Sequence, residues 1–206
     1  MIELPGQPVA ERILRRALDR QSPPQQLLLF GPAGTGKRLV ARQIAWALID
    51  PGGSHHPDAP SLDLSIVAAT GASIRLDADL EPALADLATL PTVGKRRVLI
   101  IDGAERLREQ EGAPRILKQL EEPPPRSHVI LVTDHPPVLL PTMRSRFLPV
   151  PFRSPGWRAV AATLMILKAV AMSWLTVARM LQANGGFRAP EDIRKTAMNP
   201  RPEARQ

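Results

Sequence analysis

The chain has 206 residues, of which 44% are hydrophobic and 23% charged, and it carries a net charge of +7 and no cysteine. This composition excludes a disordered chain, a disulfide framework and a thiolate metal site, while the length suffices for one sizeable core and a small second domain. The first residues, Met1 to Gly6, hold neither a basic leader nor an apolar run, so we expect no signal peptide and a cytoplasmic protein.

Most of the positive charge lies in the C-terminal part of the chain. From Pro151 onward, nine Lys or Arg residues stand against three acidic residues, a net charge of +6, whereas the first 150 residues carry +1. A basic segment favours a polyanionic partner such as DNA, because each phosphate contact releases counterions. A solvated, arginine-rich terminus fits the same composition, so charge alone does not decide between the two.

Short apolar runs separated by helical spacing predict the fold. The first run, Leu27 to Phe30, suits a buried strand, and Val40, Ile44 and Leu48 then recur every four residues, as in a helix with one apolar face. Further strands are expected over 64–67, 97–101, 128–133 and 147–150, and further helices over 80–90 and around 116–120. The alternation predicts an α/β fold with a doubly wound parallel sheet, which binds ligands at the carboxyl ends of its strands.

The composition changes after Ser154. We expect an α/β domain over 1–154, a short helical segment over 155–198 and a disordered tail over 199–206. The apolar stretch 159–181 is long enough to span a membrane, but Lys168 near its centre makes a span expensive. A small helical domain is therefore the preferred interpretation, and no membrane contact is expected.

A phosphate-binding loop follows the first strand. Residues 31–37 read GPAGTGK, directly between the strand and a helix. Gly31, Gly34 and Gly36 let successive backbone N–H groups converge on phosphate oxygens, the helix N-terminus adds positive potential, and Lys37 reaches the outer phosphates. The strand, loop and helix together make this a specific signal for a nucleotide site.

Two parts needed for hydrolysis are missing from this site. The phosphate-loop pattern requires Ser or Thr after the lysine to help hold magnesium, and this chain has Arg38, which is always charged and has no acceptor for a metal. It could instead touch a phosphate or point to solvent. Asp102 ends a buried strand where magnesium would be held, but Gly103 stands where an active ATPase has glutamate. Glu105 lies close in sequence, and we expect it to turn away.

The motifs together resemble those of the AAA+ clamp-loader family, in particular its delta prime subunits. The likeness covers residues 1 to about 152, and its most specific parts are Leu-Lys-x-Leu-Glu-Glu-Pro-Pro at 117–124 and Arg-Ser-Arg at 144–146. The other matching stretches are Gly6-Gln7, the loop 31–37, His56-Pro57-Asp58, 101–107, 129–133 and Pro141-Thr142-Met143. The resemblance makes 1–154 a nucleotide-binding-type domain and 155–198 a lid-like segment. We expect no room after them for the helical collar that assembles the ring in this family, so either assembly uses other contacts or this is a truncated or divergent copy.

The resemblance implies a role inside an assembly. Arg146 would reach in trans into the ATP site of a neighbouring subunit, and Thr133 would take the first sensor position beside the nucleotide. The chain would be a subunit of the DNA polymerase III holoenzyme that binds ATP weakly, hydrolyses it little or not at all, and helps load the sliding clamp onto primed DNA. Its partners would be gamma/tau-like ATPase subunits and a delta-like subunit, with DNA reached through the complex.

Departures from the family and other interpretations remain open at the level of sequence. Delta prime subunits often carry a four-cysteine zinc module; this chain has none, so no zinc is expected and His55-His56 suits a surface turn. Arg146 could merely pair with a local carboxylate, and Thr133 could be an ordinary strand residue. The competing functions are an active AAA+ ATPase that uses Glu105 or a partner's base, a phosphate-loop kinase, and a decayed copy without an assembly role.

Overall fold

The computed structural model describes Leu4 and residues 6–53, 60–68, 74–107, 118–139 and 141–154. By its internal contacts the chain divides into two units, Met1–Gly156 and Trp157–Gln206, and all described residues belong to the first. The lid-like segment 155–198, the tail 199–206, the apolar stretch 159–181 and the His55-His56 pair lie outside the described residues.

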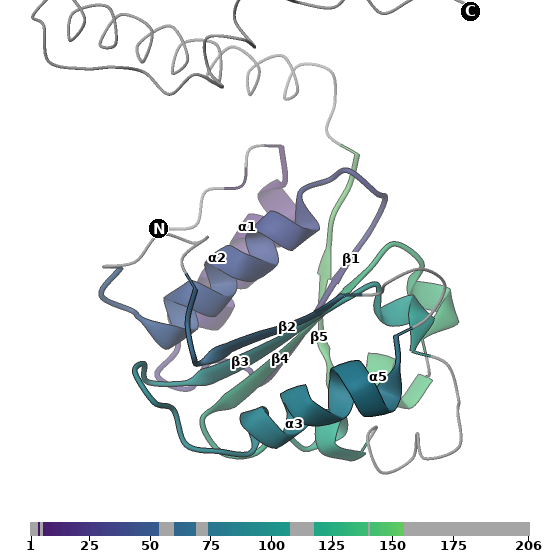
Figure 1. Ribbon diagram of the computed structural model, residues 1–206. Coiled ribbons are helices and arrows are strands. Elements are labelled where there is room, and N and C mark those ends of the chain that lie inside the picture. The colour runs from purple at the N-terminus through teal and green to yellow at the C-terminus, as the bar shows by residue number, and fades with distance from the viewer. Residues whose placement is uncertain are drawn as a thin grey trace, which may run out of the picture. The chain divides into compact units, whose positions relative to one another are not determined.

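Five parallel strands form the centre of the first unit (Figure 1), in the order β2-β3-β4-β1-β5. The five runs expected to be strands all form them, and the prediction of a parallel sheet is confirmed. Because all strands point the same way, Asp102 and Thr133 end their strands at the same edge as Phe30, from which the glycine-rich loop departs. The strands are β1 (Gln26–Phe30), β2 (Leu64–Ala68), β3 (Arg97–Asp102), β4 (Ser127–Thr133) and β5 (Leu148–Pro151).

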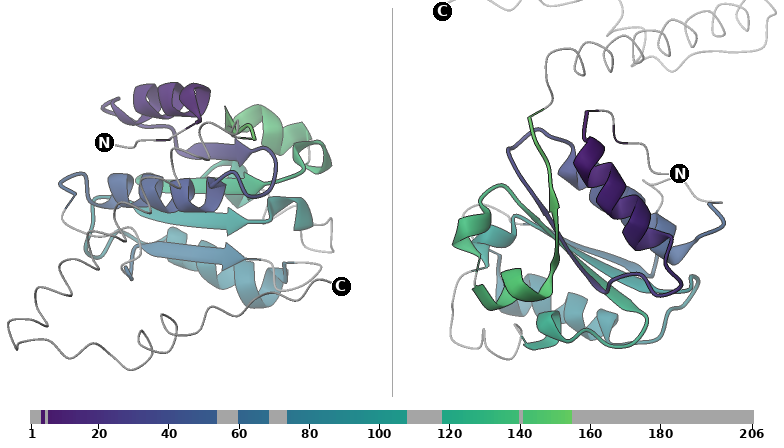
Figure 2. Two further views of the ribbon diagram at one scale, coloured as in Figure 1. Left: turned by 90° about the horizontal axis from the view of Figure 1, so that it is seen from above. Right: turned by 180° about the vertical axis from the view of Figure 1, so that it is seen from behind.

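Helices cover both faces of the sheet (Figures 1 and 2). The helices α1 (Pro8–Leu18) and α2 (Lys37–Ile49) pack on one face, and α3 (Glu81–Leu87) and α5 (Pro141–Arg146) pack on the other. Short helical turns occupy Leu76–Leu80, Ala104–Arg106 and Pro136–Val138. The sequence did not predict α1 or α5; α1 begins with proline at its first position and buries Ala10, Leu14 and Ala17.

Alternation along the strands gives the sheet its two cores. In β3, Val98 and Ile100 face α2, whereas Leu99 and Ile101 face the side of α3. All four are at most 3% exposed, and full burial of such a side chain stabilises the fold by roughly 1.5–3 kcal/mol. The near-continuous apolar runs in the sequence therefore reflect burial on both faces.

Two predicted boundaries were wrong by a few residues. The helix expected over 80–90 is α3, which ends at Leu87, and a π-helical turn over Leu76–Leu80 leads into it. The strand expected from Phe147 begins at Leu148, because Phe147 closes α5 through its N–H to the Met143 carbonyl and buries its ring in the core. The helix around 116–120 is described only from residue 118, where residues 118–121 are helical.

A buried carboxylate fixes the loop that leads into β3. The side chain of Asp63 is fully buried, and its two oxygens accept N–H bonds from Thr92, Val93 and Gly94 at 2.6, 2.8 and 2.6 Å, with Arg97 at 3.8 Å. Burial opposes ionisation, but the three N–H groups and the charge of Arg97 together lower the pKa of Asp63 below its usual value.

Exchanging Asp63 for asparagine should therefore lower the free energy of unfolding at neutral pH by about 2–4 kcal/mol, since an amide cannot accept all three charge-assisted bonds. A lowered pKa gives stability that is full above the unfolded pKa of about 3.9 and is lost as pH falls through the folded value. Urea unfolding at neutral and acidic pH should show the difference between wild type and Asp63→Asn shrinking on acidification. Asp86→Asn, at an exposed position, is the matched control, and an equal loss in both variants would contradict the assignment.

Candidate nucleotide-binding site

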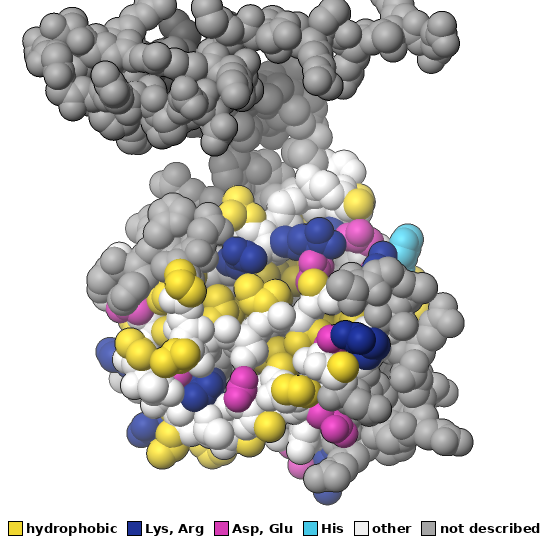
Figure 3. All heavy atoms as spheres, viewed as in Figure 1, with side chains coloured by type: hydrophobic (Ala, Val, Ile, Leu, Met, Phe, Trp, Pro, Cys, Tyr) yellow, Lys and Arg dark blue, Asp and Glu magenta, His cyan; other side chains and the backbone are white. Residues whose placement is uncertain are grey.

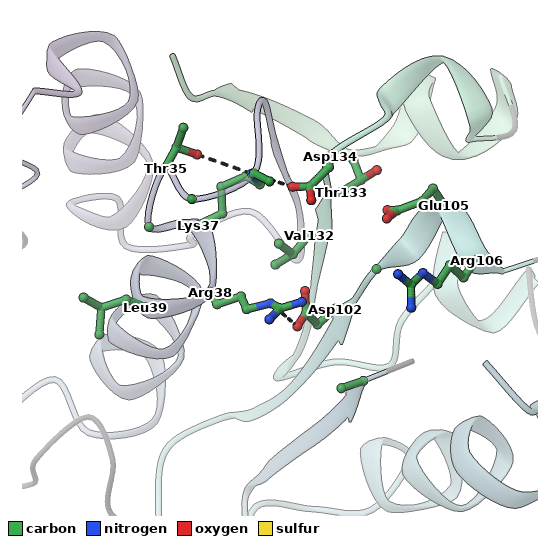
Figure 4. A pocket seen from close by; sticks show the side chains of 15 residues that line it. Thr35, Lys37, Arg38, Leu39, Asp102, Glu105, Arg106, Val132, Thr133 and Asp134 are labelled. Atoms are coloured by element: carbon green, nitrogen blue, oxygen red, sulfur yellow. Dashed lines mark hydrogen bonds and ion pairs between the residues drawn. The ribbon is translucent and has the colours of Figure 1, made fainter. Parts of the chain in front are cut away.

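A cavity of about 580 Å³ opens at the carboxyl ends of β3 and β4, beside the start of α2 (Figure 4). It brings together five of the predicted nucleotide-binding residues: Gly34, Gly36, Lys37, Asp102 and Thr133. Gly31 lies at the base of the loop, and Arg146 is not part of the lining. The remaining lining residues are Ala33, Thr35, Arg38, Leu39, Ala68, Gly103, Glu105, Arg106, Val132 and Asp134.

The three glycines of the loop serve different purposes. Gly34 and Gly36 have φ angles of 74° and 84°, in the left-handed region, and a side chain added at either would meet nothing within 4 Å. Gly31 has φ of 141°, and a Cβ there would overlap the backbone carbonyl of Phe152. Gly34 and Gly36 thus shape the loop that wraps the cavity, while Gly31 lets the loop leave the sheet against the segment that follows β5.

The ammonium group of Lys37 is ion-paired with a carboxylate of the same chain, that of Asp134. Its side chain is 4% exposed, and Nζ donates to the carbonyl oxygens of Gly31 and Pro32 at 2.7 and 2.6 Å. The carboxylate of Asp134 lies 2.7 Å from the same nitrogen (Figure 4). Sequence analysis missed Asp134, although its place directly after β4, at the edge where ligands bind, could have revealed it.

Arg38 reaches across the cavity to Asp102. Its Nε donates to Asp102 Oδ2 (Figure 4), with the arginine side chain 80% exposed and the aspartate 13% exposed. The hydrogen bond to Asp102, together with that residue's negative charge, raises the pKa of Arg38 above its ordinary value. The sequence left open a contact with phosphate or an orientation toward solvent, and the structure adds a third feature: the guanidinium neutralises the carboxylate where magnesium would be held.

The residues present do not fit a magnesium ion. Magnesium prefers near-octahedral oxygen ligands, and this cavity offers Asp102 already paired with a cation, with an arginine in place of the hydroxyl. Across the part of the chain that the structure describes, no group of three or more His, Cys, Asp or Glu side chains is arranged to hold a metal.

The turn after β3 suits the glycine that stands in place of the glutamate. Gly103 has φ of 79°, a left-handed conformation that a glutamate would adopt only with strain. Glu105 was expected to turn away, and this was wrong: the 3-10 turn Ala104–Arg106 places it in the cavity lining (Figure 4). Its Oε2 is buried and has no hydrogen-bond partner among the described residues.

Thr133 ends β4 inside the cavity. It is 1% exposed, and its hydroxyl oxygen accepts the N–H of His135 at 3.0 Å, which fixes the turn that carries Asp134. A hydroxyl both accepts and donates, so its hydrogen can be donated to a ligand oxygen in the cavity.

Arg146 lies at the end of α5, outside the cavity. Its Nε is 3.4 Å from Glu121 Oε2 and its Nη1 is 3.8 Å from Glu122 Oε1, while the side chain stays 48% exposed. The local carboxylate pairing considered from the sequence is therefore present. It leaves about half of the arginine open to solvent, so the pairing does not bury it.

Comparison with known proteins agrees with this fold. The family model described as "DNA polymerase III, delta subunit" matches residues 6–156, most of the chain. This chain belongs to the DNA polymerase III delta subunit family. The DNA polymerase III gamma/tau subunits of Mycobacterium bovis and Mycobacterium tuberculosis are 30% identical to it over 214 residues, covering 92% of this chain and 35% of theirs.

A solved structure of a DNA polymerase III gamma subunit-related protein from Thermotoga maritima matches with a TM-score of 0.57 and 25% identity, over 71% of this chain and 46% of that one. This family member therefore has the α/β fold of AAA+ phosphate-loop proteins and is of the clamp-loader type. It spans about a third of the length of the gamma/tau subunits it matches.

Two properties of the described residues concern two kinds of surroundings, a charged partner and a membrane. Over the face drawn in Figure 3, basic and acidic side chains are interspersed, in line with the near-neutral balance of the first 150 residues. No helix among the described residues is long and apolar enough to cross a membrane.

Proposed function

We propose that this chain is a clamp-loader subunit of the delta prime type, which hydrolyses ATP weakly or not at all and supplies Arg146 to the ATP site of a neighbour. The observation that carries the proposal is the ion pair between Arg38 and Asp102. It ties up the carboxylate that would bind magnesium, while the phosphate loop of the same site is kept. Its partners are gamma/tau-like ATPase subunits and a delta-like subunit, and the assembly acts in loading a sliding clamp onto primed DNA.

Charge and geometry support the proposed absence of efficient hydrolysis. Phosphoryl transfer in this class relies on a metal that neutralises the developing charge and on a residue that orients the attacking water. Arg38 is ion-paired with Asp102, the aspartate that would help hold the metal. Gly103 stands where the water-orienting glutamate would be, so that carboxylate is missing. Nucleotide binding through Lys37 and the loop amides does not need either part, so the chain binds ATP weakly.

The role of Arg146 is supported by how its surroundings hold it. Gln26 at the start of β1 donates from Nε2 to the carbonyl oxygens of Leu120 and Glu121 at 3.0 and 2.6 Å, which ties down the end of the helical turn. Glu121 and Glu122 in turn flank the half-exposed guanidinium of Arg146. An arginine that is oriented but open to solvent suits insertion between subunits, where a planar fork can pair with phosphate oxygens.

The proposal keeps the division expected from the sequence, in which a nucleotide-binding-type domain over 1–154 is followed by two segments, 155–198 and 199–206, that lie outside the described residues. The basic residues from Pro151 onward give the C-terminal part a charge of +6, which suits a neighbour rich in phosphate.

The proposal is tested by measuring ATP hydrolysis with and without a partner. The purified chain alone should turn over ATP at less than about 0.01 per second, against a median of about 10 per second for enzymes. A gamma/tau-type subunit should co-purify with it and hydrolyse ATP faster in the mixture than alone. Steady turnover by the isolated chain, or failure to co-purify, would contradict the proposal.

One observation favours an active AAA+ ATPase as the second candidate, namely the placement of Glu105 in the cavity with a carboxylate oxygen lacking a partner. In that case Glu105 would orient the attacking water. Glu105→Gln would then abolish a steady turnover by the isolated chain, whereas under the first proposal the wild type already turns over ATP weakly or not at all.

A further inference from the structure

The misfit between this cavity and magnesium points to a different way of holding phosphate. We propose that the cavity binds the phosphate groups of a nucleoside triphosphate without a divalent cation, with the guanidinium of Arg38 in the position that the metal takes in related sites. The inference rests on the proposed function only in taking a nucleoside triphosphate as the ligand of the loop.

The charges that line the cavity are balanced without a metal. Its cationic side chains are Lys37, Arg38 and Arg106, and its anionic side chains are Asp102, Glu105 and Asp134. A magnesium ion brought to Asp102 would have to displace a permanently charged guanidinium that is already hydrogen-bonded there. Magnesium also gives up its own water reluctantly, so this exchange is unfavourable.

Arg38 can take part in phosphate binding without leaving Asp102. The aspartate takes the Nε donor, and a guanidinium carries four further N–H donors in a planar fork that matches phosphate oxygens. The side chain is 80% exposed and lines the cavity from the first turn of α2, next to the loop amides. Asp102 thus positions the arginine as a fixed cation facing the loop.

The second ion pair marks where a phosphate would sit. Lys37 donates to the carbonyl oxygens of Gly31 and Pro32 and, at 3.3 Å, to the hydroxyl of Thr35, while its anionic contact, Asp134, has a side chain that is 40% exposed. A carboxylate oxygen at 2.7 Å from an ammonium stands in for a phosphate oxygen. Asp134 can swing toward solvent when the triphosphate enters, and the phosphates would then lie between Lys37 and Arg38.

Binding of ATP to the full chain, measured by calorimetry in excess magnesium chloride and in excess EDTA, tests this directly. The dissociation constant should agree between the two conditions within about twofold. AMP, which lacks the outer phosphates, should bind at least about tenfold more weakly than ATP in both. A wild-type affinity that falls about tenfold or more in EDTA, no binding of ATP in either condition, or equal binding of AMP would each overturn the inference.

Arg38→Thr restores the hydroxyl and releases Asp102. In EDTA this variant should bind ATP about tenfold more weakly than wild type, because a charge-assisted contact is gone. In magnesium it should recover affinity, so the variant acquires the metal dependence that the wild type lacks. Arg16→Thr, at an exposed position on α1, is the matched control for charge and should behave as wild type. A metal response of Arg38→Thr equal to that of the wild type would also overturn the inference.

Failure here is distinguishable from failure of the proposed function. The supply of Arg146 to a neighbour is measured by the partner's ATP turnover, and Arg146 lies outside this cavity. A chain that binds no ATP yet stimulates its partner would remove the metal-free site and leave the assembly role standing.

Discussion

Exchanging Arg146 for alanine is expected to lower ATP turnover at the neighbour's site that it enters by about a thousandfold or more, the range known for arginines supplied to a neighbouring phosphate site. The arginine is 48% exposed, and its ion pairs to Glu121 and Glu122 are long, at 3.4 and 3.8 Å. Exposed pairs of this kind contribute about 0–1 kcal/mol to stability, so the fold of the variant should be intact. The measurement is steady-state ATP hydrolysis by the reconstituted mixture, with unfolding of the isolated variant followed in urea.

Two further variants test whether the effect depends on the position of Arg146 and on its planar guanidinium group. Arg144→Ala removes an exposed arginine from the same helix and should leave turnover within about twofold of wild type. Arg146→Lys keeps the positive charge but loses the planar fork, so most of the loss should remain. If Arg146→Ala turned over ATP as fast as Arg144→Ala in the assembled complex, the role in trans would be withdrawn.

Exchanging Gly31 for alanine should cost about 3 kcal/mol or more of unfolding free energy. Its φ of 141° is one that side chains rarely adopt, and the added Cβ would overlap the carbonyl of Phe152, whose N–H donates to the Phe30 carbonyl at 2.7 Å. Backbone strain costs on the order of 1–3 kcal/mol and overpacking a similar amount. The backbone that blocks the Cβ is hydrogen-bonded to β1, so it cannot simply move aside.

Gly34 provides the matched control in the same loop. Its φ of 74° is also left-handed, but nothing lies within 4 Å of an added Cβ. Gly34→Ala should therefore lose only the conformational part, about 1–2 kcal/mol. Urea unfolding of both variants, followed by far-UV circular dichroism, compares them. Equal losses would mean that the segment after β5 yields, and that the overlap at Gly31 is not what requires glycine there.

Much of the fold could be predicted from the sequence, because the apolar residues buried by helices and strands recur at regular spacing. The apolar runs at 27–30 and 97–101 became strands buried on both faces, and Val40, Ile44 and Leu48 became the buried stripe of α2. The glycine-rich loop between the first strand and its helix likewise predicted the cavity and its lining residues Gly34, Gly36 and Lys37, while Asp102 was predicted from the end of its strand and Thr133 from the family resemblance. Boundaries were harder to predict, since a single capping contact such as that of Phe147 moves the start of a strand.

The sequence by itself determined the sheet, the phosphate loop and the absence of a hydroxyl after Lys37, because these depend on local residue type and spacing. Only the tertiary structure decided what the charged residues contact. The pairing of Arg38 with Asp102 joins residues on two elements, as do the pairings of Lys37 with Asp134 and of Arg146 with Glu121. An ion pair depends on the distance between two charged groups in the folded chain. For residues far apart in the sequence, local residue type and spacing do not predict that distance.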